Sequence, residues 1–491
     1  MTGSDNLNER TKHQIIVAFN RFDTGFEARK DNCDVMLPPL SGRLHKTFIL
    51  NGDKASNGNN KKYVVQKLNL TIFDLKAVEH MLRLLEVAQE RAQAKGAFDK
   101  GGILEGWTKV KYYNVINGET KKFLGILAGQ KILYESDEKG NHFAAWRVME
   151  FVDGRIYDKL VDIGNLKGVK HRRQYQLEAA DLFGQAIAKF GILTNFIPRN
   201  TRFMNTLPGF HDTQGYIDEM EDLLSGKRVP VRPSAHTGDN AFLAKMIDGL
   251  LEGRYQKGVY TSRIRRMIEI FRNTKFLANT FKYLPPNLQH SISHGDLKIN
   301  NVIWAMDEMG RPDHVKCFID LDTIGIYTAL DDFGDASRSI INVLGENIWE
   351  EGKVLDEIVL DKDVLEKLIE GYLKVAVNFL GNLTLEELKT YLYRAVAVYF
   401  FQLGTRFLKA FVSELCESYD GDNKRHFVYF IKHTDDDLLD KNLRLAEIQY
   451  TALVRFLKNS MEDLRLNELS IELKDLREPI GWSRHNGVLT S

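Results

Sequence analysis

The sequence predicts an α+β fold in two lobes, a small antiparallel-sheet lobe followed by a larger and mostly helical one. Three observations predict this arrangement. Short β-branched segments separated by polar turns fill the first 150 residues, long helical patterns fill most of the remainder, and the change after Asp153-Gly154 is abrupt. The 491 residues leave room for both lobes. We therefore expect a small N-lobe over residues 1–150 and a larger helical C-lobe over residues 151–491.

The predicted elements of the N-lobe are short strands around one long helix. Strands are expected at residues 47–50, 63–68, 123–133 and 143–152. Residues 51–60 contain Asn-Gly twice, which is typical of a hairpin tip. Apolar residues at helical spacing predict a helix over residues 75–95.

The C-lobe is expected to be built from long helices with one small hairpin among them. Helical patterns cover residues 174–190, 363–379, 384–418 and 443–464. The hairpin strands are predicted at 301–304 and 314–319, joined by a turn that contains Gly310-Arg311-Pro312-Asp313. Residues 225–260 mix Gly, Pro and charge, and we expect them to form a surface excursion.

Composition excludes several classes of partner. Lys plus Arg and Asp plus Glu both number 67, so a nucleic-acid or anionic-membrane footprint is not expected. The three cysteines, at 33, 317 and 416, have neither metal-ligand spacing nor the even count of a disulfide framework, which indicates a reducing, cytoplasmic setting. The N-terminus lacks a secretory signal, and the longest apolar candidate, residues 395–403, is too short for a membrane helix. The oligomeric state is not indicated.

Candidate catalytic residues flank the small hairpin. Phosphoryl transfer from a nucleotide needs a carboxylate that takes or orients the acceptor proton, and oxygen ligands for Mg²⁺. The kinase catalytic loop supplies an Asp and, five residues later, an Asn. Asp296 and Asn301 have that separation, and Asp320 ends the paired strand where a second metal ligand would stand. Asp and Asn also cap ordinary turns, but the added carboxylate favours a metal site.

Asp332-Phe333-Gly334 spells the magnesium-binding motif of protein kinases. It follows the loop 325–330 instead of the strand end. We therefore assign the metal to Asp320 and interpret Asp332 and Asp335 as supporting or helix-capping groups.

The nucleotide side offers weaker candidates. A tight turn at 41–47, with Gly42, could approach the phosphates, and Lys67 could hold them, with Glu79 to orient it. Glu150 and Phe151 lie where a hinge would grip adenine with backbone groups. Each feature has an ordinary alternative: a hairpin turn, an exposed strand lysine, a plain strand end. The absence of a Walker A pattern removes the P-loop kinases.

Two residues of the catalytic loop have further expected roles. Lys298 lies two residues after Asp296 and could neutralise charge on the transferring phosphoryl group, although lysines are also common on surfaces. His294 is expected to brace the loop and not to act in acid–base chemistry.

The pattern His-Gly-Asp-x-x-x-x-Asn followed by Ile-Asp-x-Asp resembles the aminoglycoside phosphotransferase and choline kinase superfamily, which has a protein-kinase-like two-lobed fold. The likeness is greatest to the N-acetylhexosamine 1-kinase branch. It spans roughly residues 36–456, in order along the chain, with extra residues around 225–280 and after 456. Supporting matches are residues 208–213, 319–323, 332–335, 404–408 and 442–449.

This resemblance implies an ATP- and Mg²⁺-dependent kinase that phosphorylates a hydroxyl of a small molecule, with the anomeric hydroxyl of an N-acetylhexosamine as the first candidate. It also implies that Arg406, His211 and Asp322 lie near the acceptor. The stretch 419–427 departs from the branch and leaves its aromatic acceptor residue unassigned. A choline- or ethanolamine-type kinase, an aminoglycoside-type phosphotransferase and a non-catalytic nucleotide-binding pseudokinase stay open as alternatives.

Overall fold

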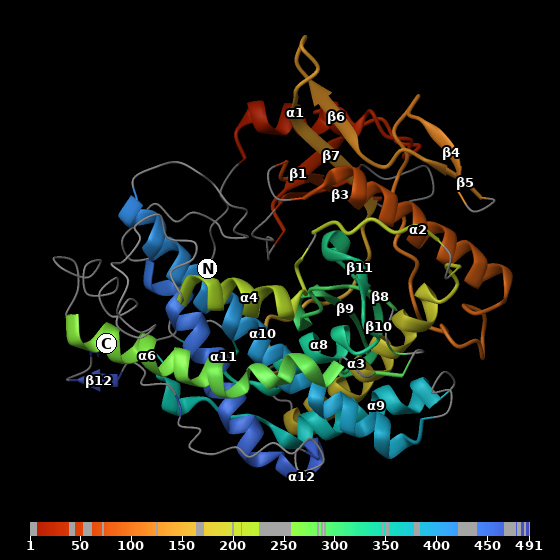
Figure 1. Ribbon diagram of the computed structural model, residues 1–491. Helices are drawn as coiled ribbons and strands as arrows, with labels where there is room; N and C mark the ends of the chain where they lie inside the picture. The colour runs from red at the N-terminus through yellow and green to blue at the C-terminus, as the bar shows by residue number, and fades with distance from the viewer. Residues whose placement is uncertain are drawn as a thin grey trace.

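The protein is seen in a computed structural model with the two-lobed α+β arrangement that the sequence predicts (Figure 1). The structure describes residues 7–38, 45–52, 61–70, 73–123, 126–163, 171–198, 201–207, 209–224, 257–281, 284–285, 288, 291–345, 348, 353–377, 383–420, 439–465, 478, 483–485 and 488–490.

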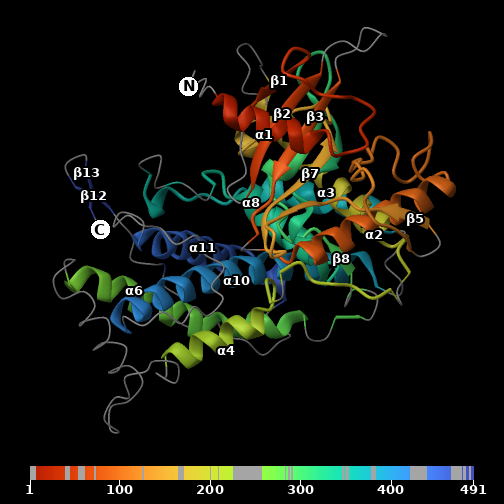
Figure 2. The same ribbon diagram turned by 90° about the horizontal axis from the view of Figure 1, so that it is seen from above.

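The N-lobe is built on a five-stranded antiparallel sheet. Its strand order is β1-β2-β3-β7-β6. The strands are β1 (Cys33–Met36), β2 (Lys46–Gly52), β3 (Lys62–Lys67), β6 (Leu133–Ser136) and β7 (His142–Glu150). Helix α1 (Glu9–Phe19) packs on one face through a cluster that includes Phe19, Tyr63 and Trp146. The opposite face is turned towards α2 (Leu75–Ala94) and the C-lobe (Figures 1 and 2).

Most of the expected N-lobe elements are confirmed. The predicted strands at 47–50, 63–68 and 143–152 correspond to β2, β3 and β7, and the predicted helix is α2. The single run expected over 123–133 is wrong, because the chain divides there into β4 (Thr120–Phe123), β5 (Ile126–Gly129) and β6. Of the expected hairpin tip, residues 53–60 lie outside the described part of the chain.

The C-lobe is mainly helical, as expected. Its helices of at least ten residues are α3 (Arg172–Thr194), α4 (Thr213–Leu224), α6 (Lys257–Thr274), α8 (Asp331–Ile341), α9 (Lys362–Ala376), α10 (Leu385–Asp420) and α11 (Leu439–Asn459). The short α12 (Met461–Leu464) follows α11, and the chain ends in the hairpin β12 (Ser483–His485) and β13 (Val488–Thr490). Helices α10 and α11 run side by side through the lobe (Figures 1 and 2). Of the predicted surface excursion, residues 225–256 lie outside the described residues.

Two glycines allow helices α3 and α9 to approach each other closely. A Cβ atom on Gly184 would lie 2.1 Å from the carbonyl oxygen of Leu368, and one on Gly371 would lie 1.9 Å from that of Asp181. Both distances are far below van der Waals contact, so only glycine fits at these positions. Side-chain size therefore sets the distance between the two helices.

Helix α10 overturns one expectation from the sequence. By length and composition its residues Leu385–Val412 could cross a membrane, whereas the sequence reading found no such stretch. In the structure 89% of the apolar 18-residue window in this helix is buried inside the protein. A buried core helix passes the same test of length and composition, so α10 is explained by its place in the C-lobe core.

Two strand pairs inside the C-lobe carry the candidate site. Strands β9 (Val302–Met306) and β10 (Pro312–Phe318) form the predicted hairpin, and β8 (Ser291–Ser293) pairs with β11 (Gly325–Tyr327). The segment after β7 leads directly onto this hairpin, because Arg155 and Trp304 exchange backbone hydrogen bonds of 3.0 and 2.8 Å. The sheet of the N-lobe is thus joined to the strands that frame the site.

One stretch of the predicted N-lobe packs on the C-lobe instead. The ring of Trp107 lies 5.1 Å from that of Phe318 and 6.2 Å from that of Phe190. The backbone N–H of Thr108 also donates to the carbonyl of Lys316. The sheet ends at Glu150, near the predicted boundary, but the loop that follows α2 shares its core with the helical lobe.

Candidate active site

The candidate catalytic loop lies between β8 and the β9–β10 hairpin, and a glycine shapes it. Gly295 has φ +84°, and a Cβ atom there would lie 2.4 Å from the carbonyl oxygen of Thr323. Both the left-handed backbone and the close approach require glycine. The Thr323 hydroxyl also donates to the carbonyl of His294 at 2.8 Å. The loop before Asp296 is therefore fixed against the segment that follows Asp320.

Asp332, in the first turn of helix α8, holds the same loop through hydrogen bonds to its backbone. Its carboxylate accepts the backbone N–H of His294 at 2.8 Å and that of Gly295 at 3.0 Å. Burial raises the pKa of Asp332 to about 6, against the opposing effect of His294 and the two hydrogen bonds. The supporting role expected for this residue is confirmed. Asp335 forms a buried ion pair with Arg338 at 2.6 Å.

His294 braces the loop, as predicted. Its ring is buried, and Nε2 lies 2.8 Å from the carbonyl oxygen of Ile319. Because Ile319 immediately precedes Asp320, this contact connects the catalytic loop to the end of the hairpin. A brace of this kind keeps the two candidate carboxylates in a fixed relation.

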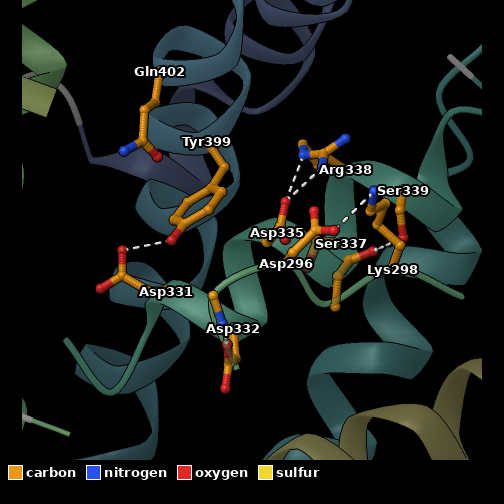
Figure 3. A network of polar contacts seen from close by, with 12 residues as sticks. Asp296, Lys298, Asp331, Asp332, Asp335, Ser337, Arg338, Ser339, Tyr399 and Gln402 are labelled. Atoms are coloured by element: carbon orange, nitrogen blue, oxygen red, sulfur yellow. Dashed lines mark hydrogen bonds and ion pairs between the residues drawn. The ribbon is translucent and has the colours of Figure 1, made fainter. Parts of the chain in front are cut away.

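Asp296 and Lys298 face each other in the loop. Their Oδ2 and Nζ atoms are 3.0 Å apart, and their side chains are 23% and 31% exposed (Figure 3). Burial acts to raise the pKa of Asp296, but the charge and hydrogen bond of Lys298 outweigh it and hold the pKa below its usual value. Asp296 is therefore an ionised carboxylate at neutral pH, able to accept a hydrogen bond from a hydroxyl group.

One side-chain and one backbone hydrogen bond of Asn301 connect it to Asp296 and to the residue before Asp320. The Asn301 amide Nδ2 donates to the carbonyl of Asp296 at 2.7 Å, and the backbone N–H of Ile319 donates to the carbonyl of Asn301 at 3.0 Å. Asp320 follows in a left-handed conformation, with φ 60° and ψ 52°. The geometry thus places the two predicted metal ligands at the entrance and exit of one hairpin.

The charge around Asp320 fits a divalent cation. Burial, followed by the negative charges of Asp322 and Asp296, raises the pKa of Asp320 to about 7. Among the described residues no group of three His, Cys, Asp or Glu side chains could hold a metal ion by itself. Mg²⁺ is commonly bound by one or two protein ligands, and phosphate oxygens and water complete its coordination. Asn301 and Asp320 would be the residues that hold the ion.

Asp322 has partners that the sequence did not predict. It is 1% exposed, and its two oxygens form a paired contact with the guanidinium of Arg147 in β7, with Nη2 at 2.6 Å. His45 Nε2 lies 3.0 Å from Oδ2. Burial acts to raise the pKa of Asp322, but Arg147 and His45 hold it far below its usual value. An acceptor contact, implied by the resemblance, does not fit a carboxylate engaged in this way.

The predicted roles of Lys67 and Glu79 are wrong. Lys67 pairs with Trp146 in the sheet and lies over its ring at 5.4 Å, on the face that packs against α1. Successive residues of a strand face opposite sides, so Gln66 faces the C-lobe instead. Glu79 does not orient Lys67: it contacts Arg83 at 3.3 Å and accepts the backbone N–H of Lys131 at 2.7 Å.

The predicted hinge is only partly available to a nucleotide. The N–H of Glu150 donates to the carbonyl of Lys111 at 2.9 Å, and that of Phe151 donates to the carbonyl of Lys62 at 3.3 Å. Both donors are therefore used inside the N-lobe, and a base would have to contact other backbone groups of this segment. Gly42 lies in 39–44, outside the described residues, so its role stays a prediction.

A cavity of about 410 Å³ adjoins the catalytic loop. Three aromatic rings, Phe210, Phe281 and Tyr327, and two carboxylates, Asp212 and Asp331, contribute to its lining. The remaining lining residues are Asn205, Gly209, His211, Thr213, Gln214, Ala278, Ile326, Thr328 and Val398. Its two carboxylates give the described lining a negative charge, so the cavity suits a neutral or cationic molecule better than an anionic one.

His211 connects this cavity to the catalytic loop. Its Nε2 donates to the carbonyl of Gly295 at 2.5 Å, and its Nδ1 lies 3.2 Å from the hydroxyl of Tyr399 in α10. The Tyr399 hydroxyl donates to Asp331 at 2.6 Å, a contact visible in Figure 3. The acceptor role of His211 stays a prediction, but its position beside Asp296 supports it.

Arg406 lies one layer behind the cavity. Its guanidinium is 4.7 Å from the centre of the Phe210 ring and 5.6 Å from that of Phe407. Arg406 is not among the described lining residues, and its guanidinium packs on Phe210, which is one of them. Its predicted acceptor role stays a prediction. The sequence reading missed Tyr399, Tyr327 and Asp331, because nothing in their own segments marks them. The packing of α10 against α8 brings Tyr399 to Asp331, and Tyr327 comes from the neighbouring strand β11.

Comparison with known proteins matches the part of the chain that carries these features. Residues 121–353 fit the family model described as the phosphotransferase enzyme family. This part of the chain is similar to that family. It includes Asp296, Asn301 and Asp320, so the match agrees with the predicted resemblance over these residues, and it does not distinguish the N-acetylhexosamine branch. The comparison with curated proteins found no match.

The fold also resembles several solved kinase and phosphotransferase structures, all at low sequence identity. A choline kinase from Cryptosporidium parvum Iowa II has 11% identity and a TM-score of 0.46, covering 93% of this chain and 99% of its own. A Plasmodium vivax ethanolamine kinase has 12% identity and a TM-score of 0.41, covering 93% and 92%. An aminoglycoside phosphotransferase from Alicyclobacillus acidocaldarius has 12% identity and a TM-score of 0.39, and the match covers 90% of this chain and 95% of its own. At these values the structures carry no argument about the acceptor.

Proposed function

We propose that the protein is an ATP- and Mg²⁺-dependent kinase that transfers the γ-phosphate to a hydroxyl group of a small molecule. One observation carries the proposal: Asp296, Asn301 and Asp320 flank the β9–β10 hairpin, where hydrogen bonds connect Asn301 to Asp296 and to the residue before Asp320, next to a cavity large enough for a small acceptor. Phosphoryl transfer needs these groups and little covalent chemistry from the protein. The match to the phosphotransferase family supports the same conclusion.

The residues of the loop divide the work of transfer. The ionised Asp296 accepts the hydrogen bond of the acceptor hydroxyl and takes or orients its proton. Lys298, 3.0 Å from Asp296, offers positive charge to the transferring phosphoryl group. Bound Mg²⁺, held by Asn301 and Asp320, would neutralise charge on the phosphates. His294 and Asp332 keep the loop in place through their contacts with Ile319 and with the loop backbone.

The acceptor that we propose first is an N-acetylhexosamine or related sugar, phosphorylated at its anomeric hydroxyl. The wall of the cavity supports a sugar, because aromatic rings and polar groups together bind neutral polyols. An amino alcohol such as choline or ethanolamine is the second candidate. Asp212 and Asp331 beside Phe210, Phe281 and Tyr327 would attract a positive charge through both the carboxylates and the ring faces.

Release of ADP from ATP and Mg²⁺ tests the activity. The purified protein is mixed with a panel of N-acetylhexosamines, other sugars, amino alcohols and aminoglycosides, and each reaction is compared with one that lacks an acceptor. We expect acceptor-dependent release that falls by about 100- to 10,000-fold in Asp296→Asn. ADP release that no acceptor increases, with nucleotide binding intact, would favour the pseudokinase alternative.

Asp212→Asn separates the two acceptor classes. An Asn side chain can still accept the N–H of Gly215, as Asp212 does at 2.8 Å, so the start of α4 is preserved while the charge is lost. A cationic acceptor should then show a KM increased by about tenfold, and a neutral sugar should change little. Asp218→Asn, on the exposed side of α4, is the matched control and should affect neither.

A further inference from the structure

Arg147 in β7 is a buried cation of the N-lobe that reaches into the candidate site. Its side chain is 1% exposed. Its Nη1 and Nη2 contact the two oxygens of Asp322, and its Nε donates to Oε1 of Gln66 at 2.7 Å. The guanidinium also lies 5.9 Å from the centre of the Tyr112 ring. One side chain thus connects the sheet of the N-lobe to the turn that follows Asp320.

The register of the sheet explains why this residue faces the C-lobe. Gln66 and Arg147 are direct partners in the β3–β7 ladder, so their side chains lie on the same face of the sheet. Lys67 pairs with Trp146 on the other face. The basic side chain on the face turned to the site therefore comes from β7, and its charge is paired with that of Asp322.

Asp322 connects Arg147 to the predicted metal ligand Asp320 through the backbone of one short turn. It lies in the single-turn helix η4 (Leu321–Thr323), which begins directly after Asp320. The left-handed conformation of Asp320 costs about 1 kcal/mol or more in a residue other than glycine, and persists only where the surroundings hold it. Arg147 and His45 anchor Asp322, and the Thr323 hydroxyl anchors the end of the turn to His294.

The second anchor also comes from the N-lobe. The backbone N–H of Asn69 donates to His45 Nδ1 at 3.0 Å, so the proton of the neutral ring lies on Nε2, facing Asp322. Burial of all three side chains excludes water from this contact. The turn at 321–323 is therefore held by residues that belong to the opposite lobe.

We propose that Arg147 is a positioning residue for the metal site: by binding Asp322 it holds the turn that aims the Asp320 carboxylate, so that the site is complete only when the N-lobe is seated on the C-lobe. This inference rests on the proposed function. It adds to that proposal a residue outside the catalytic loop and assigns Asp322 to the same task. Groups that orient a metal ligand commonly contribute about 10- to 100-fold to metal affinity or activity.

Binding of Mn²⁺ tests the inference without relying on turnover. The full-length protein is titrated with Mn²⁺ in the presence of ADP, and binding is followed by calorimetry or by water-proton relaxation. We expect Arg147→Lys, which keeps the charge but loses the paired contact, to weaken Mn²⁺ binding by about 10- to 100-fold. The matched control is Arg263→Lys, which changes an equally buried pair between α6 and α11, outside the site. It should lower the unfolding temperature and leave Mn²⁺ affinity unchanged.

Asp322→Asn and the double variant decide whether the effect passes through Asp322. If it does, the double variant binds Mn²⁺ no more weakly than the weaker single variant. Additive losses would mean that Arg147 acts on the ion or nucleotide directly, and would overturn the inference. A folded Arg147→Lys protein with wild-type affinity would also overturn it. If Arg147→Lys does not fold, Asp322→Asn is tested alone: weakened Mn²⁺ binding supports the inference, and wild-type affinity overturns it.

Failure of the proposed function would look different. Wild-type protein that binds Mn²⁺ in an Arg147-dependent way, but shows no acceptor-dependent ADP release, would remove the kinase activity and keep the positioning role. Wild-type protein that releases ADP on addition of an acceptor, with Mn²⁺ binding insensitive to Arg147 and Asp322, would do the reverse.

Discussion

The carboxylate of Asp332 accepts the backbone N–H of Gly295 at 3.0 Å, so the aspartate of an Asp-Phe-Gly motif holds the catalytic loop here. In protein kinases the same three letters mark the residue that binds magnesium. The position of the motif explains the difference. It lies in the first turn of helix α8, beyond β11, whereas Asp320 is the second residue after the end of β10.

This relationship predicts different effects for two substitutions. Asp320→Asn should lower kcat by about 1,000-fold or more and increase the Mg²⁺ concentration required, because the Mg²⁺ that offsets the phosphate charge loses one of its protein ligands. Asp332→Asn should lower kcat by about 100-fold through a displaced loop and leave the Mg²⁺ requirement as in the wild type. Mg²⁺ titrations of ADP release measure both. If Asp332→Asn alone changed the Mg²⁺ requirement, the metal would have to be reassigned.

The raised pKa of Asp332 predicts a pH-dependent stability. Burial raises this pKa to about 6, so between about pH 4 and pH 6 the folded protein keeps a proton that the unfolded chain has lost. The contribution of Asp332 to stability therefore falls as the pH rises through that range, by up to about 3 kcal/mol, and is constant above it. The check is the difference in unfolding free energy between wild type and Asp332→Asn at several pH values. A difference that rises with pH from 4 to 6 would contradict the assignment.

The contact between α3 and α9 predicts opposite effects for two Gly→Ala substitutions. At Gly371 the new methyl group would meet the carbonyl of Asp181, and we expect a loss of about 1 to 3 kcal/mol or more. At Gly191, in α3, nothing lies within 4 Å of the added atom, so alanine should stabilise the helix by up to about 1 kcal/mol. Urea unfolding followed by circular dichroism measures both variants. A stabilising Gly371→Ala would show that the helices can separate at no cost.

A buried ion pair predicts a stability effect outside the site. Arg263 in α6 and Glu447 in α11 are both fully buried and share two contacts of 2.6 and 2.7 Å. Removal of one charge leaves the other buried, so Glu447→Gln should cost about 3 to 5 kcal/mol. Replacement of both, as Arg263→Met with Glu447→Leu, should recover most of that loss. Thermal unfolding of the three proteins measures it, and equal losses in the single and double variants would argue against this explanation.

The sequence predicted those parts of the fold and site that depend on local patterns. Helical spacing located α2, α3, α9 and α10, and the separation of Asp296 from Asn301 located the catalytic loop. The face of a strand was harder to assign. Lys67 was selected for its charge, but the alternation of β3 places it with Tyr63 and Val65 against α1. The alternation of apolar Tyr63 and Val65 in β3 could have indicated that Gln66, and not Lys67, lies on the opposite face of the strand.

Contacts between distant segments could not be predicted in this way. Arg147 and Asp322 are 175 residues apart, and Tyr399 and Asp331 are 68 residues apart. Neither pair carries a local signature, because each partner alone reads as an ordinary polar residue of a strand, turn or helix. The short strands β8 and β11 were missed for the same reason, since three residues provide too little alternation to be recognised.

The position of α10 has a consequence for shortened forms of this protein. The family match ends at residue 353, yet Tyr399, more than forty residues later, touches His211 and Asp331. A fragment cut at the family boundary would retain the catalytic loop and the hairpin but lose one wall of the cavity. It would also leave the apolar surface beneath α10 open to water, and we expect such a fragment to aggregate.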